Sequence, residues 1–178
     1  VHDAPLRKRE RSDPQSLVDF GGTLFFAADD GLTGRELWKL DLATRRPVAV
    51  ADIAAGPAYS NPSELAVSNG SLYFAADDGT TGGELWKSDG TAVGTVLVKD
   101  INTGTAYGNP KDMVDLGGLL LFAATTSGSG TELWKSDGTG PGTVMVKEIR
   151  AGTSSASPAE ITVVGTSAFF AAYDGVTG

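Results

Sequence analysis

Three Glu-Leu-Trp-Lys stretches carry the side chains whose chemistry is easiest to anticipate. They contain Glu36, Glu84 and Glu132, each followed two residues later by Trp38, Trp86 or Trp134. Residues two apart in a strand lie on one face, so each Glu and Trp would project together. A Trp ring can stack on a pyranose while a carboxylate accepts hydrogen bonds from sugar hydroxyls. These six residues are candidate sugar-binding residues. The alternative is that each Trp packs between neighbouring sheets.

Paired aspartates form a second group of candidates. Asp29-Asp30 and Asp77-Asp78 are each followed by Gly, and the corresponding place in a third copy holds Thr125-Thr126. Calcium takes six to eight oxygen ligands, including carboxylates and backbone carbonyls. The four aspartates are therefore a possible calcium site, although their spacing is not that of an EF-hand loop. The alternative is that each Asp bonds the backbone of its own turn.

The residue types in the chain give little support to a catalytic site. The chain has no Cys, and its one His is His2, so no Cys nucleophile, Ser-His-Asp triad or His-metal site can be built within it. Glu84 and Asp89 could be proposed as a glycosidase pair. Such a pair needs two different environments, whereas near-identical copies supply near-identical ones. Repetition therefore indicates a non-enzyme and suits a multivalent binder or a scaffold.

The elements that position these residues recur at a fixed spacing. Successive Glu-Leu-Trp glutamates are 48 residues apart, since 84 − 36 = 48 and 132 − 84 = 48. The second copy predicts strands at residues 63–68, 71–76, 84–87 and 95–101, joined by turns such as Asn69-Gly70. Tight turns between successive strands make neighbours antiparallel. Each unit is therefore expected to be a four-stranded meander that must stack on its neighbours to bury its faces.

The repeat also carries a family resemblance. Glu-Leu-Trp-Lys-Ser-Asp-Gly-Thr at residues 84–91, with Gly-Thr-Val-Leu-Val-Lys-Asp-Ile at 94–101, resembles the ELWxxDGT repeat of bacterial secreted and surface proteins. The resemblance covers nearly the whole chain. It implies β-propeller-like blades and an extracellular or cell-surface, bacterial protein, and it carries over no catalytic residue. Residues 39–47 lose the Ser-Asp-Gly-Thr turn, and residues 125–130 lose the paired aspartates.

The expected fold is all-β, a single repeat domain over residues 1–178. Its units fall at approximately residues 1–13 (partial), 14–61, 62–109, 110–157 and 158–178 (partial). First and second strands occur four times but third and fourth strands only three times, which makes about three and a half propeller-type blades per chain. Propellers typically have about four to eight blades. We therefore expect a homodimer that completes a ring, with Val1-His2-Asp3 as the tail of a fourth strand. The alternatives are a longer repeat protein and closure within one chain.

Composition narrows the remaining function classes. The net charge of −8 disfavours nucleic acid as a partner, and no apolar run approaches the length of a membrane span. The leading expectation is a non-enzymatic extracellular binding or interaction module with a glycan or protein ligand and no cofactor other than possible calcium. A purely structural surface repeat and a glycan-active enzyme are the alternatives.

Overall fold

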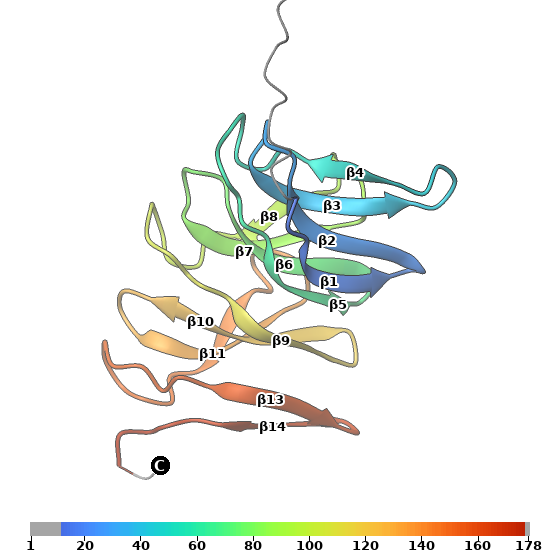
Figure 1. Cartoon of the computed structure of the whole chain (residues 1–178). Helices are drawn as coiled ribbons and strands as arrows, with labels where there is room; N and C mark the ends of the chain where they lie inside the picture. The colour runs from blue at the N-terminus through green and yellow to red at the C-terminus, as the bar shows by residue number, and fades with distance from the viewer. Residues whose placement is uncertain (1–11, 177–178) are drawn as a thin grey trace, which may run out of the picture.

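The computed structural model describes residues 12–176, which form four antiparallel β-sheets and no helix (Figure 1). The first sheet consists of β1 (Gln15–Phe20), β2 (Thr23–Asp29), β3 (Arg35–Asp41) and β4 (Arg46–Ala51). The second consists of β5 (Ser63–Ser68), β6 (Ser71–Asp77), β7 (Gly83–Ser88) and β8 (Val96–Lys99). The third consists of β9 (Lys111–Leu116), β10 (Leu119–Thr126), β11 (Gly130–Ser136) and β12 (Val144–Lys147). The last sheet is a hairpin of β13 (Ala159–Val164) and β14 (Ser167–Ala171).

Each sheet is a meander in which strands pair in chain order, as tight turns dictate. The Asn69-Gly70 turn, with both residues at positive φ, joins β5 to β6, where Ser68 pairs with Ser71. The expected all-β fold of antiparallel meanders is therefore confirmed. The fourth strand of the second sheet is shorter than residues 95–101. Thr95 bonds back into its turn, and the N–H of Ile101 turns toward Glu84 instead of a strand partner.

The sheets follow one another face to face in chain order, so that each apolar core lies between two sheets (Figure 1). Phe25 and Leu37 of the first sheet pack with Phe74 and Trp86 of the second. The second and third sheets share a core that contains Tyr73, Leu85, Phe122 and Trp134. Leu121 and Leu133 of the third sheet pack against Ile161 of the β13–β14 hairpin. One face of each inner sheet thus covers the preceding sheet and the other is covered by the next.

The first strands of the four sheets gather along one side of this arrangement. β1 contacts β5, β5 contacts β9 and β9 contacts β13. Each begins with a bulge at a residue of positive φ, namely Ser16, Glu64, Asp112 and Glu160. A proline directly precedes the first strand of each sheet, at Pro14, Pro62, Pro110 and Pro158. The residue before each proline also has a positive φ, at Asp13, Asn61, Asn109 and Ser157. These bends turn the chain from one sheet into the first strand of the next.

The expected ring closure and the expected partial unit at residues 1–13 go beyond what the described residues show. The sheets remain separate, and residues 12–176 form no closed barrel. The fourth-strand tail expected at residues 1–3, and most of the partial unit 1–13, lie outside the described residues. Because residues 12–176 contain no helix, this part of the chain offers no helical segment that could cross a membrane.

Candidate functional site

The three glutamates of the Glu-Leu-Trp stretches are buried and bind backbone rather than facing solvent. Glu84 is 0% exposed and accepts hydrogen bonds from the N–H groups of Ile101 at 2.8 Å and Gly108 at 2.7 Å. Glu36 likewise accepts from Ile53 at 2.9 Å and from the Ser60 hydroxyl at 2.6 Å. Glu132 accepts from the N–H groups of Ile149 and Ala156 in the same way. The carboxylates thus hold the connector to the next sheet and offer nothing to a ligand.

Burial also changes the acidity of two of these carboxylates. Removal from water raises the pKa of Glu84 to about 7, because the hydrogen bonds from Ile101, Gly108 and Asn102 only partly compensate for the lost hydration. The negative charge of Asp100 raises the pKa of Glu84 further. Burial likewise raises the pKa of Glu36, against the opposing effect of the Ser60 hydroxyl. Burial therefore makes ionisation of both side chains less favourable than it is in water.

Two of the three tryptophans are buried between sheets. Trp86 is 9% exposed in the core between the first and second sheets, and Trp134 is 7% exposed in the next core. The Nε1 atoms of both rings, and that of Trp38, are buried without a hydrogen-bond acceptor among residues 12–176. Trp86 and Trp134 therefore pack as the structural alternative predicts, and neither presents an open ring face to a sugar.

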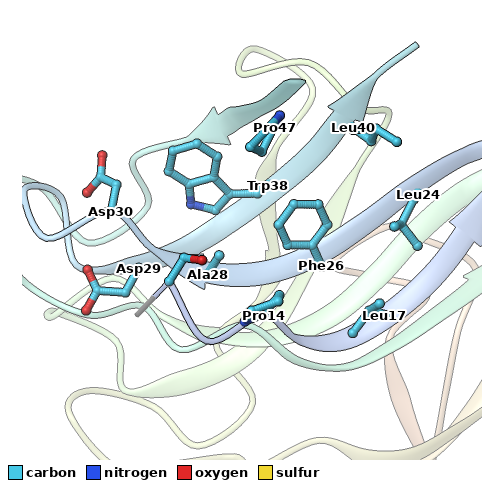
Figure 2. Close-up of a pocket in the computed structure, with 11 residues that line it drawn as sticks. Pro14, Leu17, Leu24, Phe26, Ala28, Asp29, Asp30, Trp38, Leu40 and Pro47 are labelled. Carbon is cyan, nitrogen blue, oxygen red and sulfur yellow. The ribbon is translucent and has the colours of Figure 1, made fainter. Parts of the chain in front are cut away.

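Trp38 differs from the other two because no described sheet covers its face. Its ring is half-buried and lines a pocket of about 420 Å³ on the outer face of the first sheet. Figure 2 shows the Trp38 and Phe26 rings beside each other, with Leu24 and Leu17 toward one end and Asp29 and Asp30 at the other. Leu17 is 60% and Leu24 is 36% exposed. We call this surface the Trp38 pocket.

An apolar pair extends the Trp38 pocket along β3 and β4. Leu40 and Pro47 are cross-strand partners and both line the pocket. In the second sheet the corresponding residues are Ser88, the last residue of β7, and Thr95, which directly precedes β8; their hydroxyls are hydrogen-bonded at 2.8 Å. The lost Ser-Asp-Gly-Thr turn was visible in the sequence, but its consequence, a longer apolar strip beside Trp38, was not predicted.

The paired aspartates cap their own turns. Asp30 Oδ1 accepts hydrogen bonds from the backbone N–H groups of Leu32 and Thr33, both at 2.8 Å. Asp78 Oδ1 accepts from the N–H groups and hydroxyls of Thr80 and Thr81. Asp29 and Asp77 each accept the N–H of the residue two positions on, at 2.7 Å. This geometry favours the turn-forming alternative for all four aspartates.

The acidity of these turn residues agrees with that role. The backbone hydrogen bond from Thr33 is the largest cause that lowers the pKa of Asp30. For Asp78, partial burial raises the pKa, but the hydrogen bonds from Thr81 and Thr80 outweigh it, so that the pKa is lowered overall. Within residues 12–176, no group of three or more His, Asp or Glu side chains is arranged to hold a metal ion.

Comparison with known proteins adds no assignment to this geometry. No protein-family model matches the chain, and no curated protein matches it.

Proposed function

We propose that this protein is a non-enzymatic interaction module of β-propeller type, and that the Trp38 pocket is its binding surface for protein. The observation that carries the proposal is the contrast between equivalent tryptophans. Trp86 and Trp134 are covered by the preceding sheet, whereas Trp38 is half-buried in an open apolar pocket. Exposed contiguous apolar surface of this kind marks interaction sites in soluble proteins.

The stacking of the sheets supports propeller-type blades. Their first strands begin at Gln15, Ser63, Lys111 and Ala159, which are 48 residues apart (63 − 15, 111 − 63 and 159 − 111), and these strands lie next to one another as inner strands of blades do. Three four-stranded sheets and one hairpin correspond to about three and a half blades. The extracellular, bacterial location remains a proposal that rests on the ELWxxDGT resemblance.

The chemistry of the pocket favours an apolar protein surface over a glycan. A small-molecule site needs a few polar groups that are free to fix the orientation of the ligand. Here Glu36, the expected partner for hydroxyls, is buried and bonded to the connector, and the Trp38 Nε1 atom is buried. Leu17, Leu24 and Leu40 form walls that can give no hydrogen bond. The two carboxylates of the pocket, Asp29 and Asp30, lie at one end of it and accept hydrogen bonds from their own turn (Figure 2).

We propose a second copy of the chain as the occupant of the pocket. Inside the molecule, the face that bears Trp86 packs on Phe25, and the face that bears Trp134 packs on Tyr73. The residue at the same place in β14 is Phe169, which is 60% exposed. Phe169 of a second copy would therefore meet Trp38 as Phe25 meets Trp86. A two-fold axis would make this contact twice and close two arcs into a ring.

Sedimentation velocity at micromolar concentration tests this proposal. The parent chain is expected to be a dimer, and Trp38→Glu and Phe169→Glu are each expected to give a folded monomer, since each buries a charge in the contact. Val93→Glu is the matched control, because Val93 is 92% exposed in a turn and should leave the dimer intact. A monomeric parent, or dimers that persist in both variants, would overturn the proposal. Binding of a glycan by the monomer would favour the sugar alternative.

A further inference from the structure

The outer edge of β14 differs from the edge of every other second strand. β2, β6 and β10 each pair with a third strand, β3, β7 and β11 respectively. β14 pairs with β13 on one side only, and no strand within residues 12–176 lies on its other side. An unpaired strand edge carries a row of free backbone donors and acceptors that can pair with another chain.

The side chains beside this edge indicate what is missing. Phe170 is 38% exposed, whereas Phe74 and Phe122 at the same place in β6 and β10 are 0% exposed. Phe74 is the cross-strand partner of Trp86, and Phe122 that of Trp134. The hairpin that holds Phe170 packs on the third sheet through Ile161 and Ala168, but Phe170 has no cross-strand Trp among residues 12–176.

The first sheet supplies the control for this comparison. Phe26 has Trp38 as its cross-strand partner but no described sheet over its face, and it is only 9% exposed. A neighbouring Trp therefore protects the Phe ring more than a covering sheet does. The exposure of Phe170 thus reports the missing third strand rather than the absence of another sheet.

The third sheet has an exposed valine at a place where the first and second sheets have a buried one. Val146 of β12 is 47% exposed, whereas Val98 and Val50 at the same place are 8% and 6% exposed. Val98 shares a core with Trp134, and Val50 shares one with Trp86. Both Phe170 and Val146 therefore lack contact with the same kind of side chain, a Trp on a third strand.

Among residues 12–176, a lysine of the third sheet lacks the hydrogen-bond acceptor that the equivalent lysines of the first two sheets have. Lys39 Nζ donates to the carbonyl of Gly90 at 2.8 Å, and Lys87 Nζ donates to that of Gly138 at 2.8 Å, so each reaches the turn after the next sheet's third strand. Lys135, at the equivalent place, has no hydrogen-bond acceptor among residues 12–176. A hairpin beside β14 with a Gly in its turn would supply one.

We propose that the β14 edge is a strand-accepting site, and that its occupant is a β-hairpin of the β7–β8 type supplied from outside residues 12–176. The first strand of this hairpin reads Glu-Leu-Trp-Lys and pairs with β14. Its Trp covers Phe170 and Val146, and a glycine carbonyl of its turn accepts a hydrogen bond from Lys135. Main-chain pairing gives affinity and the Trp gives selectivity, as in other cases of strand addition. This site is separate from the Trp38 pocket and extends the proposed function.

A synthetic hairpin tests the proposal directly. The probe is a fluorescein-labelled peptide with the sequence of residues 82–101, titrated with the full chain and followed by anisotropy. Saturable binding is expected, together with slowed hydrogen exchange of the chain at residues 167–171. A peptide with Trp86→Ala should bind at least about tenfold more weakly, since a stacked Trp dominates the contact.

Variants of the chain locate the site without disturbing the fold. Val146→Glu changes a side chain that is already half exposed, so the chain should fold while its affinity for the peptide falls at least about tenfold. The titration is repeated on Trp38→Glu, in which binding should be unchanged even if the Trp38 pocket proves to have no partner. Absence of binding, equal binding of the Trp86→Ala peptide, or protection only at residues 83–99 through strand exchange would each overturn the proposal.

Discussion

The backbone N–H of Gly108 donates a hydrogen bond of 2.7 Å to Glu84 Oε1 across 24 residues of sequence. Gly108 and the Glu84 carboxylate are so close that a Cβ added to Gly108 would lie 2.5 Å from Glu84 Oε2. Together with the bond from Ile101, the bond from Gly108 fixes both ends of the connector that leads into β9. The Glu of each Glu-Leu-Trp stretch is therefore a clamp between successive sheets.

Replacement of this clamp is expected to destabilise the protein. Glu84→Ala leaves the buried N–H groups of Ile101 and Gly108 without an acceptor, each at a cost of about 1–3 kcal/mol. A total loss of about 3–5 kcal/mol in the free energy of unfolding follows, and denaturant titration measures it. Glu160→Gln is the control, since Glu160 is exposed and its carboxylate has no described partner. Equal midpoints for the Glu84→Ala variant and the parent would contradict the clamp.

The buried acid also predicts a pH dependence of stability. The pKa of Glu84 is about 7 in the folded chain, against 4.5 as the ordinary value. The folded state therefore binds more protons than the unfolded state between these pH values. The contribution of Glu84 to stability is complete below pH 4.5 and is lost as the pH rises through 7, by at most about 3 kcal/mol. Urea titrations from pH 4.5 to 8 should show this decline, and Glu84→Gln should flatten it. An unchanged slope in the variant would exclude Glu84 as its source.

Gly138 tests the fit between the second and third sheets. Its φ is +89°, and an added Cβ would overlap the hydroxyl oxygen of Tyr73, whereas Gly152 has φ +81° and open space. Gly138→Ala should therefore cost at least about 1 kcal/mol more than Gly152→Ala, which measures backbone strain alone. In a Tyr73→Phe background the nearest ring carbon is 3.6 Å from the added Cβ, so the extra cost of Gly138→Ala over Gly152→Ala should disappear. Persistence of this extra cost would show that the Tyr73 hydroxyl is not the obstacle. Thermal melts of the four variants decide.

Trp86→Ala and Trp38→Ala are expected to lower the free energy of unfolding by different amounts. Trp86→Ala removes a buried ring from the core with Phe25 and Leu37, which typically costs about 3–5 kcal/mol. Trp38→Ala removes a half-buried ring from an open face and should cost the monomer only about 1–2 kcal/mol. Guanidinium titrations, with the Trp38→Ala comparison made in a Phe169→Glu background to exclude dimer effects, measure both. Similar losses for the two variants would contradict the difference in packing.

The aspartate turns predict insensitivity to calcium. Because Asp78 Oδ1 already accepts from the Thr80 and Thr81 N–H groups, millimolar calcium should leave the melting temperature unchanged. Asp78→Ala should lose about 1 kcal/mol, while Asp78→Asn retains an acceptor oxygen and should lose less. Differential scanning calorimetry with calcium and with chelator checks both points. A rise in melting temperature that Asp78→Asn abolishes would restore the metal-site hypothesis.

The sequence predicted local features well and failed where partners are remote. The Asn69-Gly70 hairpin and the meander depend on residues next to one another and were anticipated. The sequence makes Glu84 only a candidate ligand-binding group and does not reveal its structural role, because the N–H groups that it binds lie 17 and 24 residues further along the chain. Trp38 and Trp86 share one motif, and only the stacking of sheets distinguishes an open ring from a buried one.

The most direct test of the interaction proposal is photocrosslinking from the Trp38 pocket. Benzoylphenylalanine in place of Leu24, which is 36% exposed on the pocket rim, would be irradiated in the full chain at micromolar concentration. We expect covalent dimers whose linked peptides join residue 24 of one copy to residues 167–173 of the other, and we expect these dimers to be lost in Phe169→Glu. Links confined within one chain, or dimers joined elsewhere and unaffected by Phe169→Glu, would contradict the proposal.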